Sequence, residues 1–272
     1  MKTNRVRFTI IHWYLLPLVS LVVWWGMLIA LLACWGAQGR PIYSFMTKYQ
    51  NPVYISSIAA TNLQPLFIAC SGFQAIFFVC TLVVAYYLRT HGKIQSYISK
   101  VQQRFAIVSM VFATIGQLGI LFTSIFNTSA FPKVHISFVG IFIICVFLAC
   151  VFDFLISFMF GTHPDKLDPH HDFVIFGHHK WSNLYMVAFG LKVVWVATAV
   201  ALAVCFGYYM RIGHKSRSAI FEWVIAFWYG LLLIMWSMDL LSSAIRSYER
   251  KHNTEFDKTE ITCSGSNDST FV

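Results

Sequence analysis

The sequence predicts an all-α fold, a polytopic helical bundle in the membrane with six transmembrane helices. Hydrophobic residues make up 58% of the 272 positions, and charged residues only 11%. Six apolar runs each contain the roughly 20 residues needed to cross a hydrocarbon core about 30 Å thick. A helix of a soluble protein keeps a polar face, so six runs of this kind do not fit a soluble core.

The six predicted spans fill most of residues 1–245, which we predict to form one transmembrane domain. They cover residues 14–35, 66–88, 105–126, 136–160, 184–210 and 221–241. The first span follows a basic leader. Its apolar run is longer than the core of about 7–15 residues found in cleaved signal peptides, so we expect an uncleaved anchor. Residues 246–272 are polar and rich in Ser and Thr, which predicts a disordered cytosolic tail.

Basic residues are distributed unequally between the two sides of the membrane. The N-terminal segment, the second and fourth connections and the tail hold thirteen Lys and Arg residues, against six in the other three connections. Because basic residues stay on the cytosolic side, both termini are predicted to be cytosolic. The net charge of +9 then reflects flanks that face anionic phospholipids, and no nucleic-acid partner is expected. The residues predicted to face lipid in this way are Arg89, Lys93, Lys100, Arg104, Arg246, Arg250 and Lys251.

The sequence offers no clear metal, disulfide or catalytic motif. The connection 161–183 contains five His and three Asp residues, but their spacing matches no known ligand pattern, so we predict a polar loop without metal. Six of the seven cysteines lie inside spans, which argues against a disulfide framework. Phosphate-binding loops and the common hydrolase motifs are missing. We therefore expect neither a cofactor nor an enzyme.

Asp153 and Lys192 are the two ionised side chains deep inside the predicted spans. Both lie about 10–12 Å from the same side of the membrane, by the helical rise per residue. A lone charge at this depth costs at least about 2.5–3.5 kcal/mol, so we predict an intramembrane ion pair. The alternative is a working proton or substrate site, since such charges pair in either case. Asp239 lies near a span end and is given no role, while Gln74 and Gln117 are expected to join helices by hydrogen bonds.

A candidate functional rim lies at the outer ends of the spans. The first outer connection, residues 36–65, mixes turn residues with aromatic ones and predicts a folded cap on the membrane surface. A shared pocket there could be built from Tyr54, Ser56, Asn127, His135 and Glu222. The alternative is that these residues are ordinary interfacial anchors. Asn127 also opens a glycosylation sequon, although it abuts the membrane.

The order of several short motifs resembles one membrane-protein family. These motifs are the Gly-rich start of the first outer loop, Tyr54-Ile55-Ser56, His135 followed by Gly140, and Glu222-Trp223 at the start of the last span. Together with six spans they resemble the DRAM/FRAG/SFK family. The short tail looks most like its fungal branch, the suppressors of phosphatidylinositol 4-kinase defects.

The resemblance implies a non-enzymatic plasma-membrane protein that supports lipid homeostasis as a regulator or scaffold. The implied processes are phosphoinositide kinase signalling and lipid asymmetry, and the implied partners are membrane lipids, including anionic phospholipids, and a phosphatidylinositol 4-kinase complex. Alternatives are a factor akin to GPI-anchor remodelling, a small transporter, and a vacuolar, lysosomal or other endomembrane location. Ser57 and Ala59 stand where the family usually has Asp and Gly, so no role that needs this loop carboxylate is expected.

Overall fold

The computed structural model describes residues 12–46, 48–168, 179–181 and 183–264, with side chains as far as residue 241. Within these residues the chain is helical and contains no strand, which confirms the predicted all-α class. The helices are α1 (Leu15–Ala37), α2 (Ile55–Ala59), α3 (Gln64–Thr90), α4 (Lys100–Ile125), α5 (Pro132–Thr162), α6 (Leu184–Arg211) and α7 (Lys215–Ser264).

Six of these helices are long and apolar enough to cross a membrane, and they match the six predicted spans. Short polar residues begin two of them: the Ser99 hydroxyl and the Asn183 amide oxygen accept hydrogen bonds from the first turns of α4 and α6. Gly92 and Gly213 follow the ends of α3 and α6 with positive φ, the conformation that ends a helix at least cost in glycine. Local chemistry therefore sets the helix boundaries.

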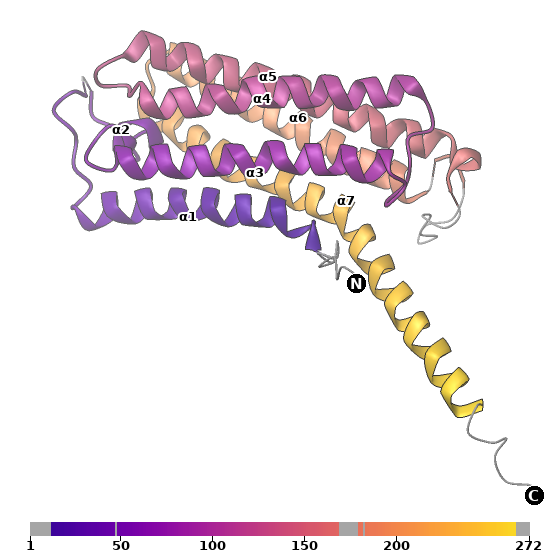
Figure 1. Cartoon of the computed structure of the whole chain (residues 1–272). Helices are drawn as coiled ribbons and strands as arrows, with labels where there is room; N and C mark the ends of the chain where they lie inside the picture. The colour runs from indigo at the N-terminus through magenta and orange to yellow at the C-terminus, as the bar shows by residue number, and fades with distance from the viewer. Residues whose placement is uncertain (1–11, 47, 169–178, 182, 265–272) are drawn as a thin grey trace, which may run out of the picture.

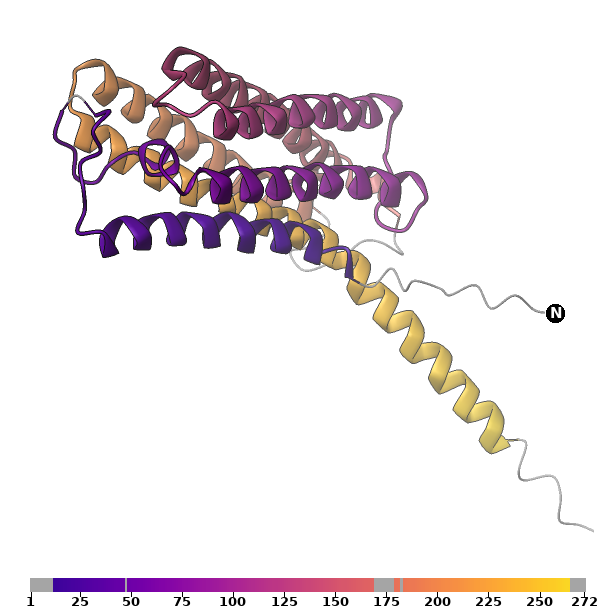
Figure 2. The same cartoon turned by 60° about the vertical axis from the view of Figure 1, so that its left-hand side comes forward.

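The six long helices form a closed ring (Figure 1). α1 packs on α3, α3 on α4, α4 on α5, α5 on α6 and α6 on α7, and α7 packs back against α1. The short α2 lies at the end of the bundle opposite the beginning of α1. Because the number of spans is even, the start of α1 and the far part of α7 lie at the same end (Figures 1 and 2). That this end is cytosolic remains a prediction.

The centre of the ring holds aromatic residues around one buried hydroxyl group. Phe78 stacks on Tyr229 with ring centroids 5.9 Å apart and meets Trp236 at 4.7 Å. The Tyr229 hydroxyl accepts hydrogen bonds from Gln74 Nε2 at 2.7 Å and from Gln117 Nε2 at 3.0 Å. These bonds join α3 and α4 to α7, the interhelical role that the sequence predicts for both glutamines.

Indole N–H groups fix the position of α7 in the ring. From α1, Trp24 Nε1 donates to the Ala226 carbonyl at 2.7 Å and Trp25 Nε1 to the Phe227 carbonyl at 3.1 Å. A tryptophan can donate only this one hydrogen, and inside a membrane no water is present to accept it. The register of α1 against α7 is therefore set by polar as well as apolar contacts.

The last helix is longer than the predicted span. We expected disorder from Arg246, whereas the backbone of α7 continues as a helix to Ser264 and projects beyond the bundle (Figure 2). The reason lies in the sequence: no Gly or Pro occurs between Gly230 and Gly265, so nothing breaks the helix as it leaves the membrane. Residues 265–272 lie outside the described part of the chain.

Candidate functional site

The first outer connection forms a folded cap on the beginning of α7. The Ile55 amide, at the start of α2, donates to Glu222 Oε2 at 2.8 Å. Beside it, Trp223 Nε1 donates to the Val53 carbonyl at 2.9 Å. A carboxylate at the amino end of a helix satisfies a backbone amide that has no partner within the helix. Two consecutive residues of α7 thus hold α2 in place.

The structure brings three of the five predicted rim residues to one cavity. Ser56, His135 and Glu222 all line it, although they come from α2, α5 and α7. Tyr54 lies next to this group, with its ring 6.3 Å from Phe206 in an edge-on contact. Burial raises the pKa of the Tyr54 hydroxyl above its ordinary value, and the nearby Glu222 carboxylate adds to the shift. The Tyr54 side chain is therefore uncharged at physiological pH.

Asn127 has a different role from the other rim residues. Its Nδ2 donates to Gln64 Oε1 at 3.0 Å, and its Oδ1 accepts from the Ala130 amide at 2.8 Å. These bonds shape the turn between α4 and α5 and tie it to α3. The nitrogen that would carry a glycan is already engaged in the fold. Glycosylation at this sequon stays a prediction.

The hydrogen bonds of His135 determine which of its ring nitrogens carries the proton. Nδ1 lies 3.0 Å from the Thr123 carbonyl and 2.9 Å from the Phe126 carbonyl. Carbonyl oxygens only accept, so Nδ1 carries the proton. In the neutral ring the other nitrogen, Nε2, is then an acceptor.

The cavity is a long apolar cleft between α5, α6 and α7, which we name the interhelical cleft. Its volume is about 740 Å³, within the range of pockets that bind small molecules. Its polar end lies at His135, and on α5 its lining continues to Cys150, about 22 Å away by the helical rise. Most of its wall is aliphatic or aromatic, as at Phe142 of α5 and at Ala199 and Ala203 of α6.

The interhelical cleft opens toward the outer surface of the bundle. Ile144 of α5 and Val204 of α6 both line it, yet they are 61% and 64% exposed. Of the 28 residues of α6, only Lys192 and Trp195 are buried. In a membrane this outer surface meets lipid chains, so a lipid can enter from the side.

Close contacts shut the other end of the cleft. A Cβ atom on Gly161 of α5 would lie only 3.0 Å from the Met186 amide nitrogen of α6, so the two backbones nearly touch there. Farther along, Trp195 Nε1 donates to the Trp228 carbonyl at 3.0 Å, and Trp228 Nε1 donates to the Trp195 carbonyl at 3.1 Å. This reciprocal pair holds α6 to α7, and beyond it residues of both α5 and α6 line the cavity.

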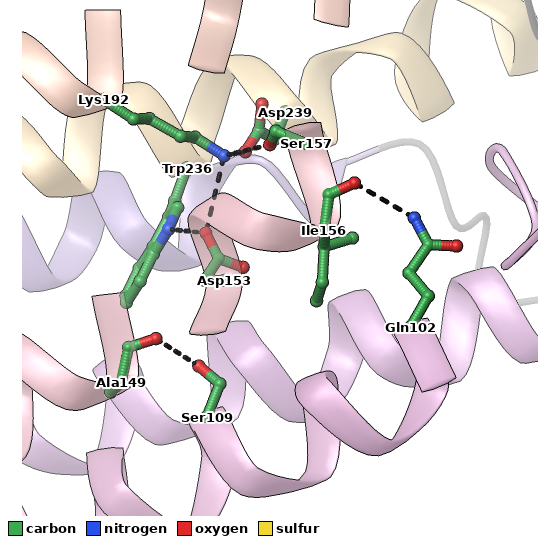
Figure 3. Close-up of polar contacts among 9 residues, drawn as sticks. All are labelled: Gln102, Ser109, Ala149, Asp153, Ile156, Ser157, Lys192, Trp236 and Asp239. Atoms are coloured by element: carbon green, nitrogen blue, oxygen red, sulfur yellow. Dashed lines mark hydrogen bonds and ion pairs between the residues drawn. The ribbon is translucent and has the colours of Figure 1, made fainter. Parts of the chain in front are cut away.

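An ion cluster lies at this closed end (Figure 3). Lys192 Nζ is 3.4 Å from Asp153 Oδ2, the pairing that their matched depth predicts, and it also donates to Ser157 Oγ at 3.0 Å. Its closest partner, however, is Asp239 Oδ2 at 2.6 Å. Our view that Asp239 has no role was wrong: α7 continues as a helix past the apolar run, so Asp239 stays beside α6. Trp236 Nε1 donates to Asp153 Oδ2 at 3.0 Å.

Arg89 faces this cluster and not the lipid headgroups. It lines a small cavity of about 30 Å³ together with Asp153, Asp239 and Tyr97, and its Nη1 donates to the Gln95 carbonyl at 3.1 Å. Burial raises the pKa of Tyr97 to about 12, so this hydroxyl stays neutral. A cavity of this size holds about one or two water molecules. It has no room for an organic substrate, which weakens the transporter alternative.

Three of the other basic residues that were predicted to face lipid are described with their side chains. Lys93, Lys100 and Arg104 are exposed. The side chains of Arg246, Arg250 and Lys251 lie outside the described part, as does most of the His-rich connection, residues 169–178 and 182. Among the residues that are described, no group of three or more His, Cys, Asp or Glu side chains is placed to hold a metal ion.

Replacing Glu222 tests how α2 is held over the polar end of the cleft. Glu222→Ala removes the acceptor of the Ile55 amide. Leaving this amide without a partner should lower the stability of the cap by about 1–3 kcal/mol. We expect faster amide hydrogen exchange in residues 53–59 of this variant. Glu222→Gln keeps an acceptor oxygen and should protect these amides more than Glu222→Ala does. Equal protection of the two variants would show that Glu222 does not hold the cap.

Comparisons with known proteins agree with the six-helix arrangement. The sequence profile of the Frag1/DRAM/Sfk1/Cwh43P N-terminal domain matches residues 12–243, nearly all of the ring. The chain is 33% identical over 275 aligned positions to Protein SFK1 of Saccharomyces cerevisiae, covering 83% of this chain and 77% of that protein. It is 24% identical to Protein sfk1 of Schizosaccharomyces pombe, covering 88% of this chain and 66% of that protein. No solved structure matches the chain. This multi-pass membrane protein belongs to the Frag1/DRAM/Sfk1 family.

Proposed function

We propose that the protein is a non-catalytic plasma-membrane protein that supports lipid homeostasis by binding a membrane lipid in the interhelical cleft. Through this binding it regulates or scaffolds phosphoinositide kinase signalling and lipid asymmetry. A phosphatidylinositol 4-kinase complex is the expected protein partner, and anionic phospholipids are expected at the basic cytosolic edge.

The observation that carries the proposal is the cleft itself. A cavity of about 740 Å³ with apolar walls lies at membrane depth and is bordered by exposed residues of α5 and α6. A hydrocarbon chain fits such walls without unpaired polar groups, whereas a polar metabolite would lose its hydrogen bonds there. Membership of a family shared with proteins named SFK1 supports a role at the membrane.

A bulky side chain placed in the interhelical cleft tests whether lipid binding there supports lipid homeostasis. In cells that lack the protein, we expect altered signal from a phosphatidylinositol 4-phosphate reporter and altered exposure of inner-leaflet lipids at the surface. Wild type should restore both, and Ala199→Phe should not, because Ala199 lines the cleft. Ala197→Phe is the matched control: Ala197 lies two residues away on α6, is exposed and does not line the cleft.

Two results would contradict the proposal. If deletion changes neither readout, the lipid role fails. If Ala199→Phe and Ala197→Phe restore both readouts equally, at equal protein levels, then the cleft is not involved. Imaging of the tagged protein in the same cells tests the plasma-membrane location against the vacuole and other endomembranes.

A lipid-remodelling enzyme is the second candidate, because His135 and Glu222 line one cavity as an acid–base pair would. Their present partners do not favour this candidate. His135 Nδ1 is held by two backbone carbonyls, and Glu222 caps α2. The test is incubation of the purified protein with defined lipids. New lipid species that disappear with His135→Gln would establish catalysis and overturn the non-catalytic assignment.

A further inference from the structure

We infer that the interhelical cleft selects an uncharged lipid whose small head is a hydroxyl group, as in diacylglycerol, and discriminates against lipids whose head is a phosphate. This inference rests on the proposed lipid binding and names the class of lipid. It follows from the chemistry of the four polar residues at the rim end of the cleft, which are Ser56, Thr123, His135 and Glu222.

The polar end of the cleft is rich in hydrogen-bond acceptors. His135 uses Nδ1 to donate to backbone carbonyls, so Nε2 of the neutral ring accepts. Glu222 uses Oε2 to cap α2, and a carboxylate can accept several further hydrogen bonds. Ser56 can accept or donate. A hydroxyl group, which both donates and accepts, complements this set.

The same end has nothing to neutralise a phosphate. None of the residues that line the cleft is Lys or Arg, the usual partners of phosphate groups. A phosphate buried at this position would have no basic side chain in the lining to balance its charge, in a medium that screens charge poorly. The basic side chains nearest in sequence do not line the cleft. Lys133 is exposed at the start of α5, and Arg217 lies over the Tyr209 ring at 5.7 Å. Electrostatics therefore excludes a phosphate head from this end.

The side chain of Thr123 is one of several buried polar groups without a hydrogen-bond partner in the described residues, and it lies at the polar end of the cleft. It lines the cleft and is only 3% exposed, yet its Oγ1 has no hydrogen-bond partner. A buried hydroxyl without a partner is costly, and such groups are uncommon in folded proteins. A lipid hydroxyl at the polar end would supply the partner, with the chain along the apolar wall.

Crosslinking with two lipids that differ only in the head tests the inference. The full chain is reconstituted in phosphatidylcholine nanodiscs containing a diacylglycerol with a photoreactive diazirine in one acyl chain. A second sample contains phosphatidic acid with identical chains. We expect labelled peptides from residues 139–147 and 196–204. The label from diacylglycerol should be about tenfold stronger, a ratio well within the cost of burying a phosphate without a basic partner.

Variants of the same protein test which residues determine the preference. Thr123→Val should fold as wild type, since its hydroxyl has no partner to lose, and should reduce the preference for diacylglycerol. Ser56→Lys places a cation at the rim and should shift the preference toward phosphatidic acid. Ala199→Phe should abolish labelling by both lipids, with Ala203→Phe as a second filling variant if the first is poorly folded and Ala197→Phe as the unaffected control.

The outcomes separate this inference from the proposed function. Equal labelling by both lipids that Ala199→Phe abolishes would overturn the selectivity and leave lipid binding in place. Stronger labelling by phosphatidic acid would also overturn it. Absence of cleft labelling by either lipid would refute binding altogether, and with it both proposals.

Discussion

Lys192→Met should leave little folded protein. The substitution removes the ammonium group that pairs with Asp153 at 3.4 Å and with Asp239 at 2.6 Å, while both carboxylates remain partly buried. Breaking a buried pair by removing one partner costs about 3–5 kcal/mol, a large part of the stability of an ordinary domain. We expect loss of the monodisperse peak in size-exclusion chromatography of a fluorescent fusion. Lys100→Met, at an exposed lysine, is the control.

Combined substitutions decide whether the cluster has three members. The triple variant Lys192→Gln, Asp153→Asn, Asp239→Asn removes the three charges that pair with one another. The half-buried Arg89 keeps its hydrogen bond to the Gln95 carbonyl, so the folded peak should recover. The double variant Lys192→Gln, Asp153→Asn leaves Asp239 without Lys192 and should remain impaired. Full recovery in that double variant would exclude Asp239 from the cluster. A triple variant that folds normally but does not restore lipid phenotypes would give the cluster a functional role.

The spans could be predicted from sequence because they depend on local composition. An apolar run of the right length must be helical in a membrane, since backbone hydrogen bonds can be satisfied there in no other way within one segment. The prediction that a span begins at Leu184 is confirmed, because Asn183 provides a cap directly before an apolar run. Asp153 and Lys192 could be paired from depth alone, since consecutive helices are antiparallel.

The interhelical cleft could not be predicted in this way. In a membrane, a residue that faces lipid and a residue that lines an apolar cavity have the same composition. Ala197 and Ala199 are indistinguishable in the sequence, yet only Ala199 lines the cleft. The two residues lie about 200° apart around the helix, so the rotation of α6 about its own axis decides which of them faces the cavity. Helix rotation also decides that Arg89 points inward and that Asp239 pairs with Lys192. A hydropathy pattern with few polar residues does not predict this rotation.

Gly119→Leu should destabilise the protein by about 3 kcal/mol, at the upper end of the usual cost of overpacking. A Cβ on Gly119 of α4 would lie 3.0 Å from the Phe142 amide nitrogen of α5, so a larger side chain must push two backbones apart. The contact between α4 and α5, which we name the α4–α5 seam, also contains two hydrogen bonds. Ser109 Oγ donates to the Ala149 carbonyl at 2.8 Å, and Gln102 Nε2 donates to the Ile156 carbonyl at 3.0 Å (Figure 3). Thermal unfolding of the purified protein measures the loss.

This substitution should also narrow the cleft, because α5 lies between the seam and the cavity. Phe142 touches Gly119 through its backbone and also lines the cleft, so any shift of α5 away from α4 moves this wall toward α6. Lipid crosslinking should therefore fall in Gly119→Leu protein that remains folded. Gly140→Leu on α5 is the matched control, since nothing lies within 4 Å of its added Cβ. If Gly119→Leu and Gly140→Leu unfold at the same temperature, the α4–α5 seam is not the support of the cleft.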